Sequence, residues 1–317
     1  MKSYLNKFLL ILIGTFPSCA LLIEEDLTDK EIFINQPVDG TVSSRQSQTF
    51  WWENIDGTLS YNLQVFIVDS NQIEEIIADT NLVKNKFIIS LNPGEYNWRI
   101  RAWNNYSSTD FFSHRLTILE SPSLTEQEVV LISPVDFGFK KDTSIFFKWY
   151  ALSMAENYIL EIRSNNWQGS LVYPKITTSY DTMTLSLQEG VYQWGVMAQN
   201  EISTTEFSIR NLTIDTKNPY EPILSSPIDS TVYNKKTIEF SWIHPTPEDE
   251  NFLLDTLIVS SDSLFHSSGI VFSKGVSEKK YSVDINSNGK YFWRVKSIDK
   301  AGNHSEWSIV RSFFITL

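Results

Sequence analysis

The sequence predicts an all-β protein made of three tandem β-sandwiches, and three observations support this fold class. Phe-x-Trp followed by Gly-x-Tyr-x-Trp occurs three times, at an interval of about a hundred residues, which is the size of one sandwich domain and far above that of a short solenoid repeat. The paired aromatic residues stand two apart, so each pair faces one side of a strand. Aromatic residues make up 14% of the chain and charged residues 20%, as expected of folded domains. The repeated residues are Phe50, Trp52, Gly94, Tyr96 and Trp98; Phe147, Trp149, Gly190, Tyr192 and Trp194; and Phe240, Trp242, Gly289, Tyr291 and Trp293.

Residues 1–18 are predicted to be an export signal. Lys2 and Lys7 precede an apolar run over residues 8–16, which is shorter than the roughly 20 residues that a transmembrane helix needs. Cys19, the one cysteine of the chain, follows directly. This arrangement resembles the signal of bacterial lipoproteins. The resemblance implies cleavage before Cys19 and attachment of fatty acyl chains, such as palmitate, to that residue; an ordinary signal peptide with an incidental cysteine is the alternative.

The rest of the chain divides into a tether and three modules. We expect a lipidated tether over residues 19–31, and modules over residues 32–119, 129–215 and 223–317. The segment between the second and third modules contains two prolines, which favour a stiff, extended linker. A single cysteine allows no intramolecular disulfide, so each module depends on packing for its stability.

Alternation of apolar and polar residues predicts the strands of the first module. They are expected at residues 49–52, 61–68, 86–91, 96–103 and 115–119. The six tryptophans of the repeated pattern are predicted to form the cores, where burial of one indole contributes up to about 4–6 kcal/mol.

The segment from Leu91 to Tyr96, with its Leu-x-Pro-Gly turn, gives the pattern a family resemblance. Together with Trp52 and Ala102 it resembles a fibronectin type III domain, and residues 299–308 are similar to the bacterial cell-surface variety of these modules. The resemblance implies a fibronectin type III or immunoglobulin-like two-sheet sandwich, in which the Tyr96 hydroxyl bonds a nearby backbone group.

No catalytic, metal or cofactor motif is found in the sequence. The four histidines have no second His or Cys at the spacing of a zinc site, and nucleophile-elbow, phosphate-loop and EF-hand patterns do not occur. The acidic run at residues 248–250 is expected to be a solvated loop, with cation binding as the alternative. We therefore expect a protein that is not an enzyme and needs no cofactor. The net charge of −12 disfavours nucleic acid as a partner.

Four residues of the first module are candidates for ligand binding: Trp51, Arg101, Trp103 and Tyr106. Strand alternation predicts that Trp51 and Trp103 face outward, where aromatic rings beside arginine provide a platform on which sugars stack. The alternative is that both rings pack under a loop or against the next module.

These expectations together predict a lipid-anchored protein of the bacterial outer membrane or cell surface. Its modules are expected to serve binding, adhesion or scaffolding toward a protein or carbohydrate ligand. The alternative function is that of a glycan-binding accessory lipoprotein of a polysaccharide-uptake system.

Overall fold

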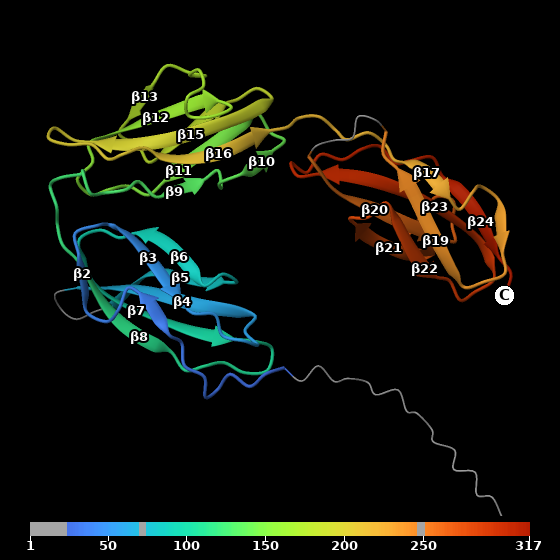
Figure 1. Cartoon of the computed structure of the whole chain (residues 1–317), viewed down its shortest axis with the longest axis horizontal. Coiled ribbons are helices and arrows are strands. Elements are labelled where there is room, and N and C mark those ends of the chain that lie inside the picture. Colours follow the sequence, from blue (N-terminus) through green and yellow to red (C-terminus); the bar gives the residue numbers. More distant parts are fainter. Residues whose placement is uncertain (1–23, 70–73, 246–250) are drawn as a thin grey trace, which may run out of the picture. The chain divides into compact units, whose positions relative to one another are not determined.

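The computed structural model describes residues 24–69, 74–245 and 251–317, and this part of the chain is nearly all β-structure. Figure 1 shows three sandwiches, each built of two layers of strands. The chain divides into two compact units, the first made of most of the residues up to Ile118 and the second containing the second and third modules. The predicted fold class, tandem fibronectin type III-like sandwiches, is confirmed by these sheet pairs.

The first module pairs a three-stranded sheet, in the order β1-β3-β6, with a five-stranded sheet, in the order β2-β8-β7-β4-β5. The pairs β1–β3, β4–β5, β4–β7 and β7–β8 are antiparallel, whereas β2 runs parallel to β8. The strands are β1 (Ile34–Gln36), β2 (Thr41–Ser43), β3 (Ser47–Trp52), β4 (Ser60–Val68), β5 (Glu74–Leu82), β6 (Lys86–Ser90), β7 (Gly94–Trp103) and β8 (Phe112–Ile118).

The second and third modules repeat this topology. Their three-stranded sheets have the orders β14-β11-β9 and β17-β19-β22, and their five-stranded sheets the orders β10-β16-β15-β12-β13 and β18-β24-β23-β20-β21. The strands of the second module are β9 (Leu131–Ser133), β10 (Gly138–Lys140), β11 (Ser144–Trp149), β12 (Asn157–Ser164), β13 (Ile176–Thr178), β14 (Thr182–Ser186), β15 (Gly190–Gln199) and β16 (Ser208–Ile214). Those of the third are β17 (Ile223–Ser226), β18 (Thr231–Tyr233), β19 (Thr237–Ile243), β20 (Phe252–Ser260), β21 (Ile270–Val276), β22 (Lys280–Asp284), β23 (Gly289–Asp299) and β24 (Arg311–Ile315), with one 3-10 turn at Ser267–Gly269.

Each sandwich has a core built on the same aromatic pair, one ring from each sheet. The ring centroids of Phe50 and Trp98 lie 4.9 Å apart in an edge-to-face contact. The equivalent pairs, Phe147 with Trp194 and Phe240 with Trp293, lie 5.0 and 5.1 Å apart. All six tryptophans of the repeated pattern are at most 1% exposed, which confirms the predicted core.

A proline and an aspartate direct the chain from one sheet to the other in every module. Pro37 follows β1, and because proline has no N–H to donate, the pairing of the first strand ends there. Two residues later the Asp39 carboxylate accepts a hydrogen bond of 2.8 Å from the backbone N–H of Arg115 on β8. Asp136 and Asp229 accept equivalent bonds in the other modules. The aspartate thus holds the segment after the first strand beside the last strand of its module, and the second strand of the module then pairs with that last strand.

Burial begins earlier in the chain than the predicted modules do. Leu27, expected in the tether, is fully buried, and its N–H donates to the Ser107 hydroxyl at 2.8 Å. Leu124, expected in a linker, is fully buried in the core of the second module, and its N–H donates to Ser203 in the same way. These two segments therefore pack against the sandwich that follows them.

The tyrosine hydroxyls behave as the family resemblance implies in the second and third modules. Tyr192 donates to the Gln188 carbonyl at 2.8 Å, and Tyr291 donates to the Ser287 carbonyl at 2.9 Å. In the described part of the chain, no helix has the length and apolar character required to cross a bilayer.

Candidate binding surface

The structure places the predicted ligand-binding residues on two different sheets. Trp51 lies on β3, in the three-stranded sheet, and is 43% exposed. Arg101 and Trp103 lie on β7, in the five-stranded sheet, and both are partly exposed on its outer face. Tyr106 is exposed in the loop between β7 and β8. Trp51 and Trp103 therefore face outward as predicted but do not share a platform, and Cys19 lies outside the described residues.

The outer face of β7 carries a stack of alternating aromatic and cationic side chains, which we call the ladder of the first module: Phe66, Arg99, Phe111 and Arg101. The Arg99 guanidinium lies 5.1 Å from the Phe66 ring centroid and 4.5 Å from that of Phe111. The Arg101 guanidinium lies 4.7 Å from the Phe111 ring centroid. Contacts at these distances are attractive by roughly 0.5–2 kcal/mol each.

The two arginines of this ladder have no anionic partner among the described residues. Arg99 donates one bond, from Nε to the Gln64 amide oxygen at 2.7 Å. The Nε of Arg101 is buried and unpaired. The neighbouring carboxylate of Asp79 instead accepts hydrogen bonds from Asn62 and Gln64, both at 2.9 Å. Guanidinium donors therefore remain available beside a partly exposed tryptophan.

The third module carries a ladder of the same order, made of Phe265, Arg294, Trp307 and Lys296. The Arg294 guanidinium lies 4.1 Å from both ring centroids, and Lys296 lies 5.5 Å from Trp307. The Nε of Arg294 is buried and unpaired, and burial holds the pKa of this guanidinium below its ordinary value. Arg99 and Arg294 each follow directly after a core tryptophan on the equivalent strand.

The second module has no cation at these positions. Gly195 and Met197 replace the two arginines. The Trp167 ring occupies the vacated space and contacts the Phe207 ring in a tilted arrangement, with centroids 5.1 Å apart. A Cβ atom at position 195 would approach the Trp167 ring to 2.7 Å, so glycine is required for this packing. Arg163 lies over Trp167 at 5.3 Å, but it is paired with Glu161 at 2.6 Å.

A cleft of about 380 Å³ adjoins the first ladder. Its lining includes Arg99 of the ladder, as well as Asp39, His114 and Arg115. Hydrogen bonds from the Arg115 side chain and backbone lower the pKa of the Asp39 carboxyl to about 2. Arg115 and Asp39 bind each other. Arg99 is therefore the cation in the lining of this cleft that lacks a carboxylate partner.

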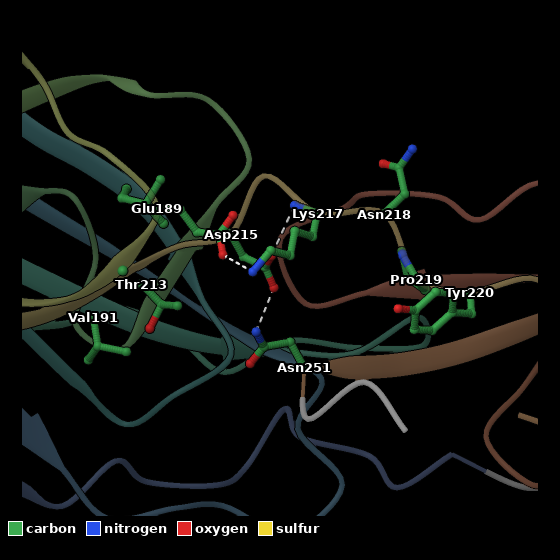
Figure 2. A pocket seen from close by; sticks show the side chains of 11 residues that line it. Glu189, Val191, Thr213, Asp215, Lys217, Asn218, Pro219, Tyr220 and Asn251 are labelled. Atoms are coloured by element: carbon green, nitrogen blue, oxygen red, sulfur yellow. Dashed lines mark hydrogen bonds and ion pairs between the residues drawn. The ribbon is translucent and has the colours of Figure 1, made fainter. Parts of the chain in front are cut away.

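A second cavity, of about 430 Å³, lies in the second unit beside the segment that follows β16. Figure 2 shows Asp215 between Lys217 and Asn251, accepting bonds from the backbone N–H of Lys217 at 3.2 Å and from the Asn251 amide at 2.5 Å. Lys217 forms an ion pair with Glu189. The charged groups here satisfy one another, so this cavity is a weaker candidate for binding than the ladder.

The third module contains a buried polar cluster that the sequence analysis missed. The fully buried Asp255 carboxylate accepts bonds from Trp242 Nε1 at 2.5 Å and Ser297 Oγ at 2.6 Å, and lies 2.8 Å from His244 Nε2. The serine and the histidine both contact the carboxylate instead of each other, and the serine is buried, at 1% exposed, so its hydroxyl is not presented to a substrate. Its signal in the sequence is the replacement of Tyr61 and Tyr158, at equivalent positions, by Asp255.

Metal binding has no candidate in the described residues, where no three His, Cys, Asp or Glu side chains are grouped as ligands. The acidic run at residues 248–250 lies outside the described part of the chain.

Comparison with known proteins yields similarity at the level of structure. No family model matches the chain, and no curated protein matches it. Among solved structures, the FN1–FN3 domains of chicken CNTN1 are similar with a TM-score of 0.45 and 16% identity, over 90% of this chain and 98% of that one. Fibronectin(III)-like modules of Clostridium thermocellum CbhA give a TM-score of 0.40 and 14% identity, over 60% of this chain and 94% of that one.

Proposed function

We propose that this chain is a lipoprotein of the bacterial outer membrane or cell surface that displays three sandwich modules for binding, adhesion or scaffolding. The observation that carries the binding role is the ladder of the first module, where Arg99 and Arg101 stand on an outer sheet face without an anionic partner among the described residues. Anchoring is supported by the sequence, in which the single cysteine ends the one signal-like run. Two acyl chains on Cys19 would hold the protein stably at a membrane.

The proposed role is not catalytic. In the described residues, the polar cluster at Asp255 is buried and the charges of the larger cavity are paired with each other. Neither presents an accessible nucleophile beside a base, which acyl- or group-transfer chemistry needs.

The anchoring is tested by replacing the proposed lipid attachment residue. When the full chain is expressed with a fatty-acid analogue, the wild type is expected to carry the label, and Cys19→Ser to carry none, because the hydroxyl of serine does not replace the thiol as acyl acceptor. Membrane fractionation of both proteins gives a second readout. Label that persists in Cys19→Ser would refute lipidation at this residue.

A glycan-binding accessory of a polysaccharide-uptake system is the second candidate function. Trp103 supports it, since this partly exposed ring lies on the same outer face as two arginines. In polysaccharide co-sedimentation with residues 24–317, Trp103→Ala is expected to weaken binding several-fold, whereas Trp51→Ala on the other sheet leaves it unchanged. Equal loss in both variants would contradict a site on the face of β7.

A further inference from the structure

We propose that the ladder of the first module binds a saccharide that carries an oxyanion substituent, a carboxylate or a sulfate, with Arg99 and Arg101 as the groups that hold the anion. This inference rests on the glycan-binding alternative and names its ligand class and its site. It moves the site away from Trp51, which lies on the other sheet.

The two guanidinium groups have unused hydrogen-bonding capacity. Arg101 donates to no acceptor among the described residues, and Arg99 uses only Nε, toward Gln64. Both groups lie over the Phe111 ring, at 4.5 and 4.7 Å from its centroid. A planar guanidinium fixed in this way presents its remaining N–H groups as a fork that matches carboxylate and sulfate oxygens.

The sandwich fold itself does not need these cations. The second module builds the same sandwich with Gly195 and Met197 at the equivalent positions, and fills the space with Trp167. Partly burying an arginine without a counter-charge costs free energy, because its hydration is lost. Two such arginines on one face are therefore better explained by a ligand than by stability.

The surroundings of the ladder also suit an anionic sugar. Trp103 lies two residues beyond Arg101 on the same face of β7, about 6.6 Å along the strand, so an aromatic ring stands next to the anion-binding groups. The carboxylates nearby do not compete for the arginines, because Asp79 is bound by Asn62 and Gln64, and Asp39 by Arg115. An anionic sugar would meet cationic donors and a stacking surface together.

The charge of the whole chain adds a condition to this binding. With a net charge of −12, the protein repels polyanions at long range, so attraction must come from close contact with the ladder. Non-specific attraction of polyanions to the protein surface as a whole is thereby disfavoured.

The experiment measures binding of residues 24–317, which hold all the cores described above, to immobilised polygalacturonate, dextran sulfate and neutral dextran. The two anionic polymers distinguish carboxylate from sulfate. Arg101→Gln is expected to lower the affinity for the preferred anionic polymer at least tenfold. Arg101→Lys keeps the charge but loses the planar fork, so its affinity is expected to lie between those of the wild type and Arg101→Gln. Lys84→Gln, which removes one exposed charge from the same module, is the matched control and is expected to bind like the wild type.

Thermal melts followed by circular dichroism show whether each variant is folded. If Arg101→Gln does not fold, the affinity of Arg101→Lys tests the proposal in its place. If Arg101→Gln folds and binds with wild-type affinity, the proposal is overturned. If only Arg101→Lys folds, wild-type affinity in that variant overturns it. Dextran bound as tightly as the anionic polymers would overturn it while leaving the glycan-binding function in place. Failure to bind any of the three polymers would overturn both the proposal and that alternative, and leave the protein-binding role.

Discussion

At the scale of single residues, the position of an aromatic side chain on its strand decides whether it stabilises the core or faces solvent. Phe50 and Trp52 are fully buried, while Trp51 between them is 43% exposed. This alternation was readable from the sequence because successive side chains of a strand point to opposite faces. The sheet to which a strand belongs was not readable in this way, which is why the different sheets of Trp51 and Trp103 emerge only in the structure.

A titration of Asp39 tests the contact that fixes the start of β2. Its pKa is lowered from 3.8 to about 2, chiefly by hydrogen bonds from the Arg115 side chain and backbone. A lowered folded-state pKa means that the contact stabilises the fold above pH 3.8 and that this stabilisation is lost as the pH falls toward 2. In Arg115→Gln, NMR of the carboxyl carbon is expected to show the Asp39 midpoint shifted upward toward 3.8.

Asp229 is the internal control for this titration. Its pKa is also lowered, but by bonds from the backbone and hydroxyl of Ser312, with no arginine involved. Its midpoint should be the same in Arg115→Gln as in the wild type. An Asp39 midpoint in Arg115→Gln equal to that of the wild type would show that the Arg115 side chain does not bind the carboxylate in solution.

At the scale of strands, periodicity predicted the strands with two distinct faces and missed β1, β2 and β5. The predicted ranges 49–52, 61–68, 86–91 and 96–103 correspond to β3, β4, β6 and β7, and the range 115–119 corresponds to the second half of β8. Strands β1 and β2 have three residues each, too few to show a period. Strand β5 lies at the sheet edge, and its adjacent Ile76 and Ile77 are both exposed, so pairing with β4 defines it and alternation does not.

The ladder shows the same limit for the binding surface. That Arg99 and Arg101 face one side of a strand follows from their spacing. The rings on which they stack come from β4 and from the segment just before β8, so the contacts depend on strand register across the sheet. The sequence does carry one local signal. The residue directly after the core tryptophan is Arg in the first module, Gly in the second and Arg in the third.

At the scale of the whole molecule, each of the three modules has a complete core of its own. The buried cluster of the second module draws only on residues 124–214, and that of the third only on residues 224–315. Each core contains its own Phe–Trp pair and its own two sheets. Modules of this kind are expected to unfold separately, because the loss of one core removes little buried apolar area from the others.

Replacement of one core tryptophan tests this independence most directly. Trp98 is 1% exposed and contacts Phe50, so Trp98→Ala is expected to cost the first module about 3–5 kcal/mol. Trp51→Ala, on the outward side of β3 where the ring is 43% exposed, is the control and should cost clearly less stability than Trp98→Ala. In hydrogen exchange followed by mass spectrometry, Trp98→Ala should remove protection from peptides of the first module and leave those of the second and third unchanged. Wild-type protection throughout, or loss of protection in all three modules, would contradict the account.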